Sequence, residues 1–396
     1  MSPPRPGTWT MAHTFKAVGY RTGAFSANSM IDRRGFRAGF DEFWAFGGSR
    51  RYRKSFLLFR LLGGKNSLKA FRRVARLHLH KEKAPHIRPR LRRWLEQDTS
   101  TPFFLYVHLV DPHWPYYDRG LGMVPEQLSD LDQPLLYLDL LRLTNGDPDN
   151  AAYRSKPELR ELVGRYDDEI RLADRFIGNL IEDLDDLEMD DSTLIVVLGD
   201  HGEEFFEHNG FGHGHDVYQE QVHVPLLFRW PNEPAFSSLP PRVDVPVSLI
   251  DVLPTLVDYL RLPPLPPTTT GLSLRRLLEG RAVGKQRPVA SEAEARTFGY
   301  REGDVKVRLA YPEDARSQSK GVGFAYDLIG DPGEAKPLPP SDPRTRRVIA
   351  RAKAYVERHL RQRGDIRLPA LKTKAKPTLS PDKEALDRLR ALGYVD

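Results

Sequence analysis

A histidine-rich loop carries the strongest chemical signal in this sequence. Five of the twelve histidines fall between residues 201 and 223, and the loop opens with Asp200-His201 directly after the apolar run 193–198. In open α/β sheets, ligands bind in the crevice at the carboxyl ends of the strands. A carboxylate beside an imidazole offers a divalent cation a mixed oxygen and nitrogen site. The loop therefore predicts metal or anion chemistry at a strand end, in preference to a solvated surface loop.

His113 occupies an equivalent position after another predicted strand. His113 follows the apolar run 103–110, which predicts a strand buried on both faces. We therefore expect His113 to face the same crevice as Asp200 and His201. A histidine titrates near neutral pH, which suits general acid or base catalysis. The loop also contains five glycines that let its backbone turn tightly and approach a ligand: Gly199, Gly202, Gly210, Gly212 and Gly214.

Helix and strand patterns alternate along the first 285 residues, with a Gly/Phe-rich loop at 33–46. Alternation of this kind favours an α/β fold with a mainly parallel sheet flanked by helices. The patterns predict strands at 21–28, 103–110, 193–198 and 225–230, and helices at 10–19, 88–97, 158–187 and 247–260.

The pattern changes after residue 285. Short strands separated by turn residues, then a helix at 344–360, predict a small antiparallel α+β lobe. We therefore expect three parts: an α/β core over 1–285, the lobe over 286–361, and a linker with a C-terminal helix over 362–396.

A basic segment interrupts the core. Residues 50–93 contain sixteen lysines and arginines against one acidic residue, Glu82. Such a segment indicates a helical insertion that attracts an anionic surface or substrate. It lacks the interleaved aromatic residues or helix-turn-helix pattern of a nucleic-acid reader, which argues against nucleic acid as a partner.

Composition excludes other classes. The 396 residues are 40% hydrophobic and 29% charged, which is typical of a globular protein. With no cysteine, the chain has no disulfide and no cysteine nucleophile. The apolar runs are too short for a transmembrane segment, and the first residues show no secretory signal, so the sequence as written reads as cytoplasmic while its localisation stays open.

Several segments, taken in order, resemble the sulfatases of the alkaline phosphatase superfamily. The resemblance implies an alkaline-phosphatase-like fold and metal-dependent hydrolysis of sulfate esters. The segments include Asp111-Pro112-His113, Asp200-His201-Gly202-Glu203, Glu207-His208-Asn209-Gly210, Gly212-His213-Gly214 and the C-terminal stretch 389–395.

The resemblance also implies roles for these residues. Asp200 and His201 match metal ligands for one divalent cation, which could be Ca, Mg, Mn or Zn. His113 and His213 match catalytic positions that touch the transferred group or protonate the departing oxygen. Supporting roles fall to His208, His215 and Glu203.

The chain departs from the family at its start. Paired aspartates and a Cys/Ser-x-Pro-x-Arg nucleophile motif open the family's core, and neither stands ahead of the helix predicted at 10–19. Ser2-Pro3-Pro4-Arg5 and Ser341-Asp342-Pro343-Arg344 each fall one residue short of the motif. We therefore assign no nucleophile, and expect a chain that lacks this N-terminal segment to bind anions with little turnover.

Three alternatives stay open. One is a phosphodiester or phosphonate monoester hydrolase of the same superfamily, because a histidine at the position of His201 occurs in a subgroup with that activity. Another is a catalytically dead, polyanion-binding relative. A calcineurin-type metallophosphoesterase is disfavoured because no G-N-H motif exists in the sequence. If the chain is a hydrolase, we expect its partner to be an anionic ester substrate, sulfated or phosphorylated.

Overall fold

The computed structural model describes residues 8–28, 31, 35–45, 84–114, 116, 121–122, 155, 157–232, 236–267, 269–281, 288–293, 297–310 and 322–362. Most of the basic segment, the proposed linker and the C-terminal helix lie outside these residues. Their predictions are therefore neither supported nor contradicted.

The N-terminal half forms a parallel sheet, as predicted. Strand β1 (Arg21–Ser26) lies between β2 (Glu42–Ala45) and β3 (Phe103–His108) and pairs in parallel with both. Helix α1 (Met11–Lys16) precedes it, and the positive φ of 88° at Gly19 ends the helical segment where the sequence predicts. The sequence analysis placed β2 in a loop, because the glycines before it obscured a four-residue strand.

Strand β3 departs from its prediction in one respect. The apolar run predicted burial on both faces, yet Tyr106 is 42% exposed. Its ring instead lies 6.4 Å from that of Phe40, which covers only part of this face. The expectation of a doubly buried strand is therefore wrong at this position.

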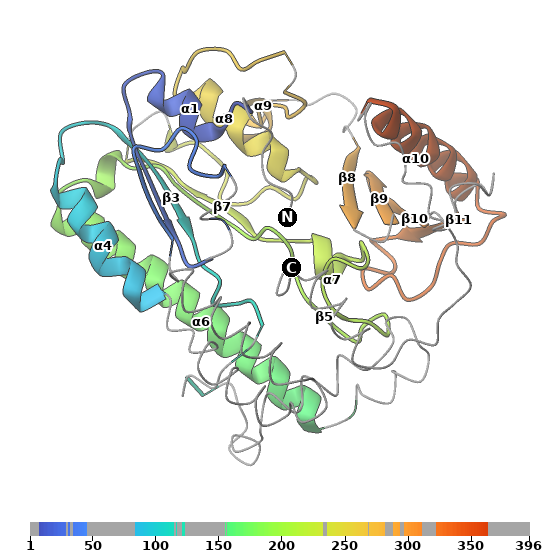
Figure 1. Cartoon of the computed structure of the whole chain (residues 1–396). Helices are drawn as coiled ribbons and strands as arrows, with labels where there is room; N and C mark the ends of the chain where they lie inside the picture. The colour runs from blue at the N-terminus through green and yellow to red at the C-terminus, as the bar shows by residue number, and fades with distance from the viewer. Residues whose placement is uncertain are drawn as a thin grey trace, which may run out of the picture.

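Two helices cover the parallel sheet on one side (Figure 1). They are α4 (Ala84–Glu96) and α6 (Pro157–Asp186). The buried face of α4 packs into the core with Phe25 and Phe176, and consists of Ile87, Leu91, Trp94 and Leu95. Arg88 and Arg92 of α4 both bind the buried Asp183 of α6. These two cations of the basic segment therefore hold the two helices together.

Strands β4 (Ile195–Leu198) and β7 (Leu226–Arg229) pair antiparallel, an exception to the mainly parallel arrangement that the sequence predicts. The chain between them has no long crossover helix, so it can return in the opposite direction. It contains β5 (Glu204–Phe205), β6 (Phe211–Gly212) and the short helix α7 (Gln219–Val222). We call residues 199–223 the histidine loop.

The remaining helices of the core lie beside β4 and β7. A 3-10 turn, η6 (Leu249–Asp251), leads into α8 (Val252–Tyr259), and α9 (Arg275–Leu278) follows. Another 3-10 turn, η4 (Asp190–Ser192), precedes β4. Val252 and Leu256 of α8 pack with Phe15 of α1, which closes a hydrophobic cluster over the strands.

The C-terminal lobe is antiparallel, as predicted. Its strands are β8 (Val289–Ala293), β9 (Thr297–Glu302), β10 (Val305–Ala310) and β11 (Val322–Asp327). In the described residues the sheet has the order β11-β10-β9-β8, and α10 (Pro343–Gln362) packs on one face (Figure 1). Val307 and Leu309 of β10 are fully buried against Ala352 and Val356 of α10. No described helix is both long and apolar enough to cross a bilayer.

Candidate functional site

Three histidine rings from two distant segments meet beyond β3 and β4. The ring centroids of His201 and His213 are 3.8 Å apart, and the rings are stacked. The centroid of His113 lies 5.2 Å from that of His213 and 6.4 Å from that of His201. The expected convergence of these three side chains is therefore a feature of the fold, because β3 and β4 end at the same place.

Asp200 stands at the edge of this group, which we call the histidine cluster (His113, His201 and His213). Its Oδ1 atom is 3.8 Å from Nε2 of His201, and its side chain is 57% exposed. Its negative charge reaches β3, where burial and then Asp200 raise the pKa of Tyr106. Asp200 therefore borders both strands that end at the crevice.

Backbone carbonyls fix the tautomers of two of these rings. Nδ1 of His113 lies 2.8 Å from the carbonyl oxygen of Trp114, and Nδ1 of His201 lies 2.9 Å from that of Gly202. A carbonyl oxygen only accepts, so Nδ1 carries the proton and donates in both rings. Nε2 is then the nitrogen at which each ring can gain or lose a proton or bind a metal.

A buried carboxylate fixes the tautomer of the third ring, that of His213. Nδ1 of His213 donates to Oε1 of Glu203 at 2.8 Å, and the Glu203 side chain is only 4% exposed. The hydroxyl of Tyr116 donates to the other oxygen of Glu203. Tyr116 thus links the loop after β3 to the loop after β4, and it is a residue to which sequence reasoning gave no role.

Glu204 organises the turn that carries His213. Its Oε1 accepts the backbone amides of His208 at 3.0 Å and Gly210 at 2.6 Å. Its Oε2 accepts from His215 at 2.7 Å and Gln221 at 2.9 Å. Burial raises the pKa of Glu204, but the hydrogen bonds and the His215 ring outweigh burial and leave it below its ordinary value. The carboxylate therefore stays ionised inside the loop.

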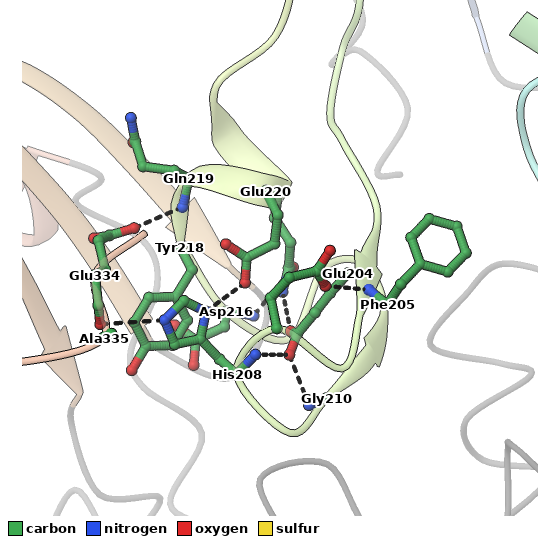
Figure 2. Close-up of polar contacts among 12 residues, drawn as sticks. Glu204, Phe205, His208, Gly210, Asp216, Tyr218, Gln219, Glu220, Glu334 and Ala335 are labelled. Atoms are coloured by element: carbon green, nitrogen blue, oxygen red, sulfur yellow. Dashed lines mark hydrogen bonds and ion pairs between the residues drawn. The ribbon is translucent and has the colours of Figure 1, made fainter. Parts of the chain in front are cut away.

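His208 and His215 are bound within the protein. His215 contacts Glu204. His208 contacts Glu220 at 2.6 Å through Nδ1 (Figure 2). Their supporting roles stay predictions, with these partners now defined. Sequence reasoning missed Glu220, although an acidic residue within the histidine-rich stretch 201–223 is a candidate partner for one of its histidines.

Close packing explains two of the loop glycines. A Cβ on Gly202 would lie 2.0 Å from the carbonyl oxygen of Glu220, and one on Gly210 would lie 2.5 Å from Nε2 of His215. The sequence analysis expected these glycines to let the backbone approach a ligand. At these two positions the backbone instead approaches atoms of the loop itself.

A metal fits the crevice only in part. Asp200 and His201 supply an oxygen and a nitrogen donor, which suit a divalent cation. Across the described ranges, no group of three or more His, Asp or Glu side chains is placed to hold one. Two donors do not make a complete site, since a tight site usually takes four or more ligands.

A serine motif that sequence reasoning passed over lies elsewhere. Ser238-Leu239-Pro240-Pro241-Arg242 fits the pattern Ser-x-Pro-x-Arg. It follows β7, whose last residue pairs with the first residue of β4, so it lies at the opposite end of these strands from Asp200. Arg242 is 83% exposed and binds Asp244. The motif therefore does not join the histidine cluster.

Comparisons with known proteins agree on one family. The family described as Sulfatase matches residues 2–262. Arylsulfatase K of Mus musculus is 34% identical over 273 residues, covering 61% of this chain and 47% of the mouse protein. An endo-4-O-sulfatase of Bacteroides thetaiotaomicron is 25% identical over 266 residues, covering 61% of this chain and 48% of that protein. The chain thus spans about half the length of these relatives.

Solved structures share the fold. A protein in complex with its substrate D-glucosamine-2-N,6-O-disulfate superimposes with a TM-score of 0.62 at 18% identity, covering 94% of this chain and 85% of the other. The phosphonate monoester hydrolase of Agrobacterium radiobacter gives a TM-score of 0.61 at 18% identity, covering 91% and 81%. At this identity the likeness establishes the α/β architecture.

Proposed function

The chain belongs to the sulfatase family, and from this premise we propose that it acts in the hydrolysis of sulfate esters at the crevice beyond β3 and β4. The observation that carries the proposal is the histidine cluster. Three imidazoles at one crevice can bind an anion and transfer a proton. A sulfated ester is therefore the class of substrate that we infer.

His213 is the residue we assign to proton transfer. Glu203 accepts from its Nδ1, so the proton that moves is the one on Nε2. The buried pair of Glu203 and Tyr116 holds the ring in one orientation, as a carboxylate does for a catalytic histidine. His213 would then protonate the departing ester oxygen.

His113 is assigned to binding the transferred group. Its Nδ1 is held by the carbonyl of Trp114, and its ring lies next to that of His213. When protonated, it offers a charge-assisted hydrogen bond to a sulfate oxygen.

Asp200 and His201 are assigned as part of the ligand set of a divalent cation. Members of this family are generally metal-dependent, and a bound cation would stabilise the charge of the sulfate group. The imidazole donor favours Mn, Zn or Mg over Ca, because Ca prefers oxygen ligands. We derive no further step through the cation and assign no nucleophile.

A second candidate activity is phosphonate or phosphate ester hydrolysis. The imidazole of His201 beside Asp200 favours it, because that pair resembles the subgroup with this activity. Parallel assays with an aryl sulfate and an aryl phosphonate monoester separate the two. Faster turnover of the phosphonate would replace the first proposal with the second.

Anion binding tests the site directly. Calorimetric titration of the 396-residue protein with sulfate, with and without Mn²⁺, should show binding that His213→Gln weakens about tenfold, roughly the contribution of one charge-assisted hydrogen bond. His359→Gln is the matched control, since His359 lies on α10 in the lobe. Equal sulfate affinity in the two variants would refute the assignment of His213.

Turnover separates an enzyme from a polyanion-binding relative. Hydrolysis of 4-nitrophenyl sulfate that depends on an added divalent cation and is lost in Asp200→Ala would support catalysis. Sulfate binding through the histidine cluster without any hydrolysis would favour a binding protein.

A further inference from the structure

His208 joins two parts of the protein that are distant in sequence. Its Nδ1 lies 2.6 Å from Oε1 of Glu220 in the histidine loop, and its Nε2 lies 3.2 Å from the carbonyl oxygen of Glu334, which follows β11 (Figure 2). Its ring stacks on Tyr218 with a centroid separation of 3.5 Å and an interplanar angle of 0°. The side chain is 13% exposed. Stacking on Tyr218 and a contact at each ring nitrogen therefore fix the position of the ring.

Both hydrogen-bond partners of this ring are acceptors. A carbonyl oxygen only accepts, and so does an ionised carboxylate. A neutral imidazole has one N–H, so it could satisfy Glu220 or Glu334 but not both. The geometry fits the doubly protonated imidazolium, which donates from both nitrogens.

We propose that His208 is an imidazolium latch that holds the histidine loop on the C-terminal lobe, and that its deprotonation loosens this contact as pH rises. The inference goes beyond the proposed function and does not depend on it.

The charges around His208 favour its protonated form. Burial lowers the pKa of His208, but Glu220, the Glu334 carbonyl and Glu204 together outweigh burial and raise it above the ordinary value. On the lobe side, the ammonium of Lys306 donates to the Glu334 carboxylate at 2.9 Å. The charged and titratable groups of the surrounding elements are Glu204, Glu207, Asp216, Tyr218, Glu220, Lys306, Arg308, Tyr326 and Glu334.

Other contacts between the two parts do not involve His208. The carboxylate of Glu334 accepts the amide of Gln219 at 2.7 Å. Arg308 makes two hydrogen bonds of 2.6 Å with Asp216. Loss of the latch should therefore loosen the contact without separating the lobe.

The sign of the pH effect follows from linkage. A histidine whose pKa is raised on folding stabilises the folded state fully below its unfolded pKa of about 6.5, and this stabilisation is lost as pH rises through the folded pKa. Each unit of difference between the two values changes the opening equilibrium about tenfold. The contact should therefore be firm at pH 6 and looser at pH 9.

Hydrogen exchange of the whole chain tests the latch. After correction for intrinsic rates, peptides from 203–223 and 328–342 should exchange about tenfold faster at pH 9 than at pH 6. His208→Gln should remove this pH dependence, because glutamine does not titrate, while His359→Gln should keep it. The same pH dependence in His208→Gln, or none in the wild type, would overturn the proposal.

Glu220→Gln provides a test that does not require removing the ring. The amide oxygen still accepts from Nδ1, but the negative charge is gone, so the midpoint of the pH transition should move to lower pH. This variant also decides the matter if His208→Gln does not fold. An unchanged midpoint would refute the latch.

Discussion

Replacing Glu204 should unfold the histidine loop and destabilise the whole protein. Its side chain is 1% exposed and receives hydrogen bonds from His208, Gly210, His215 and Gln221. In Glu204→Ala, these donors lose their acceptor. A buried donor without a partner costs about 1–3 kcal/mol. Water that enters the cavity left by the side chain would satisfy some of these donors, so adding the full cost for all four donors would overestimate the loss.

We expect Glu204→Ala to lower the free energy of unfolding by about 3–5 kcal/mol, the range for removing one partner of a buried charged network. Glu204→Gln should cost less, about 1–3 kcal/mol, because its oxygen can still accept the two backbone amides. These losses are large against the 5–15 kcal/mol that is typical of a domain.

Urea denaturation followed by far-ultraviolet circular dichroism measures both variants. Asp244→Ala is the matched control, since the Asp244 side chain is 77% exposed, and it should stay within about 0.5 kcal/mol of the wild type. A loss below about 1 kcal/mol in Glu204→Ala would refute the view that this carboxylate organises the loop. If that variant does not fold, Glu204→Gln supplies the measurement.

Three further predictions concern the same region. Gly202→Ala should destabilise the folded protein by about 3 kcal/mol, because the new Cβ would lie 2.0 Å from a backbone oxygen. Gly178→Ala in α6 places its Cβ in open space and should stabilise the protein by about 0.5–1 kcal/mol. Thermal unfolding of the two variants measures the difference. A double-mutant cycle on Arg308 and Asp216 should give a coupling of about 1–2 kcal/mol in urea denaturation, and additive losses would contradict their pairing. Because the folded pKa of Glu204 is lowered, its stabilisation is present above about pH 4.3 and lost as pH falls further, so acid titration of Glu204→Gln should show a shallower loss of stability than the wild type.

Local patterns were enough to predict much of the fold. The apolar periodicity of 158–187 predicted α6, which spans Pro157–Asp186, and the alternating strands after residue 285 predicted the antiparallel lobe. These signals are local, because a helix or strand reports its buried face at a fixed spacing. The sequence analysis missed β2, which has only four residues and follows a glycine-containing turn.

The sequence also allowed the prediction that the candidate site lies at strand ends. His113 and His201 each follow an apolar run, and the shared edge of an α/β sheet brings such positions together. The direction of β7 could not be predicted this way, because a short apolar run carries no information about whether the neighbouring strand is parallel.

The sequence by itself determined which side chains gather at the crevice: their types and their positions after predicted strands are local properties of the chain. The tertiary structure alone decided what holds them. Tyr116 reaches Glu203 across 87 residues and His208 reaches Glu334 across 126, and such partners are set by packing of distant segments. Hydrogen-bond partners then fix which nitrogen of each imidazole carries its proton, because a ring nitrogen facing an acceptor must donate.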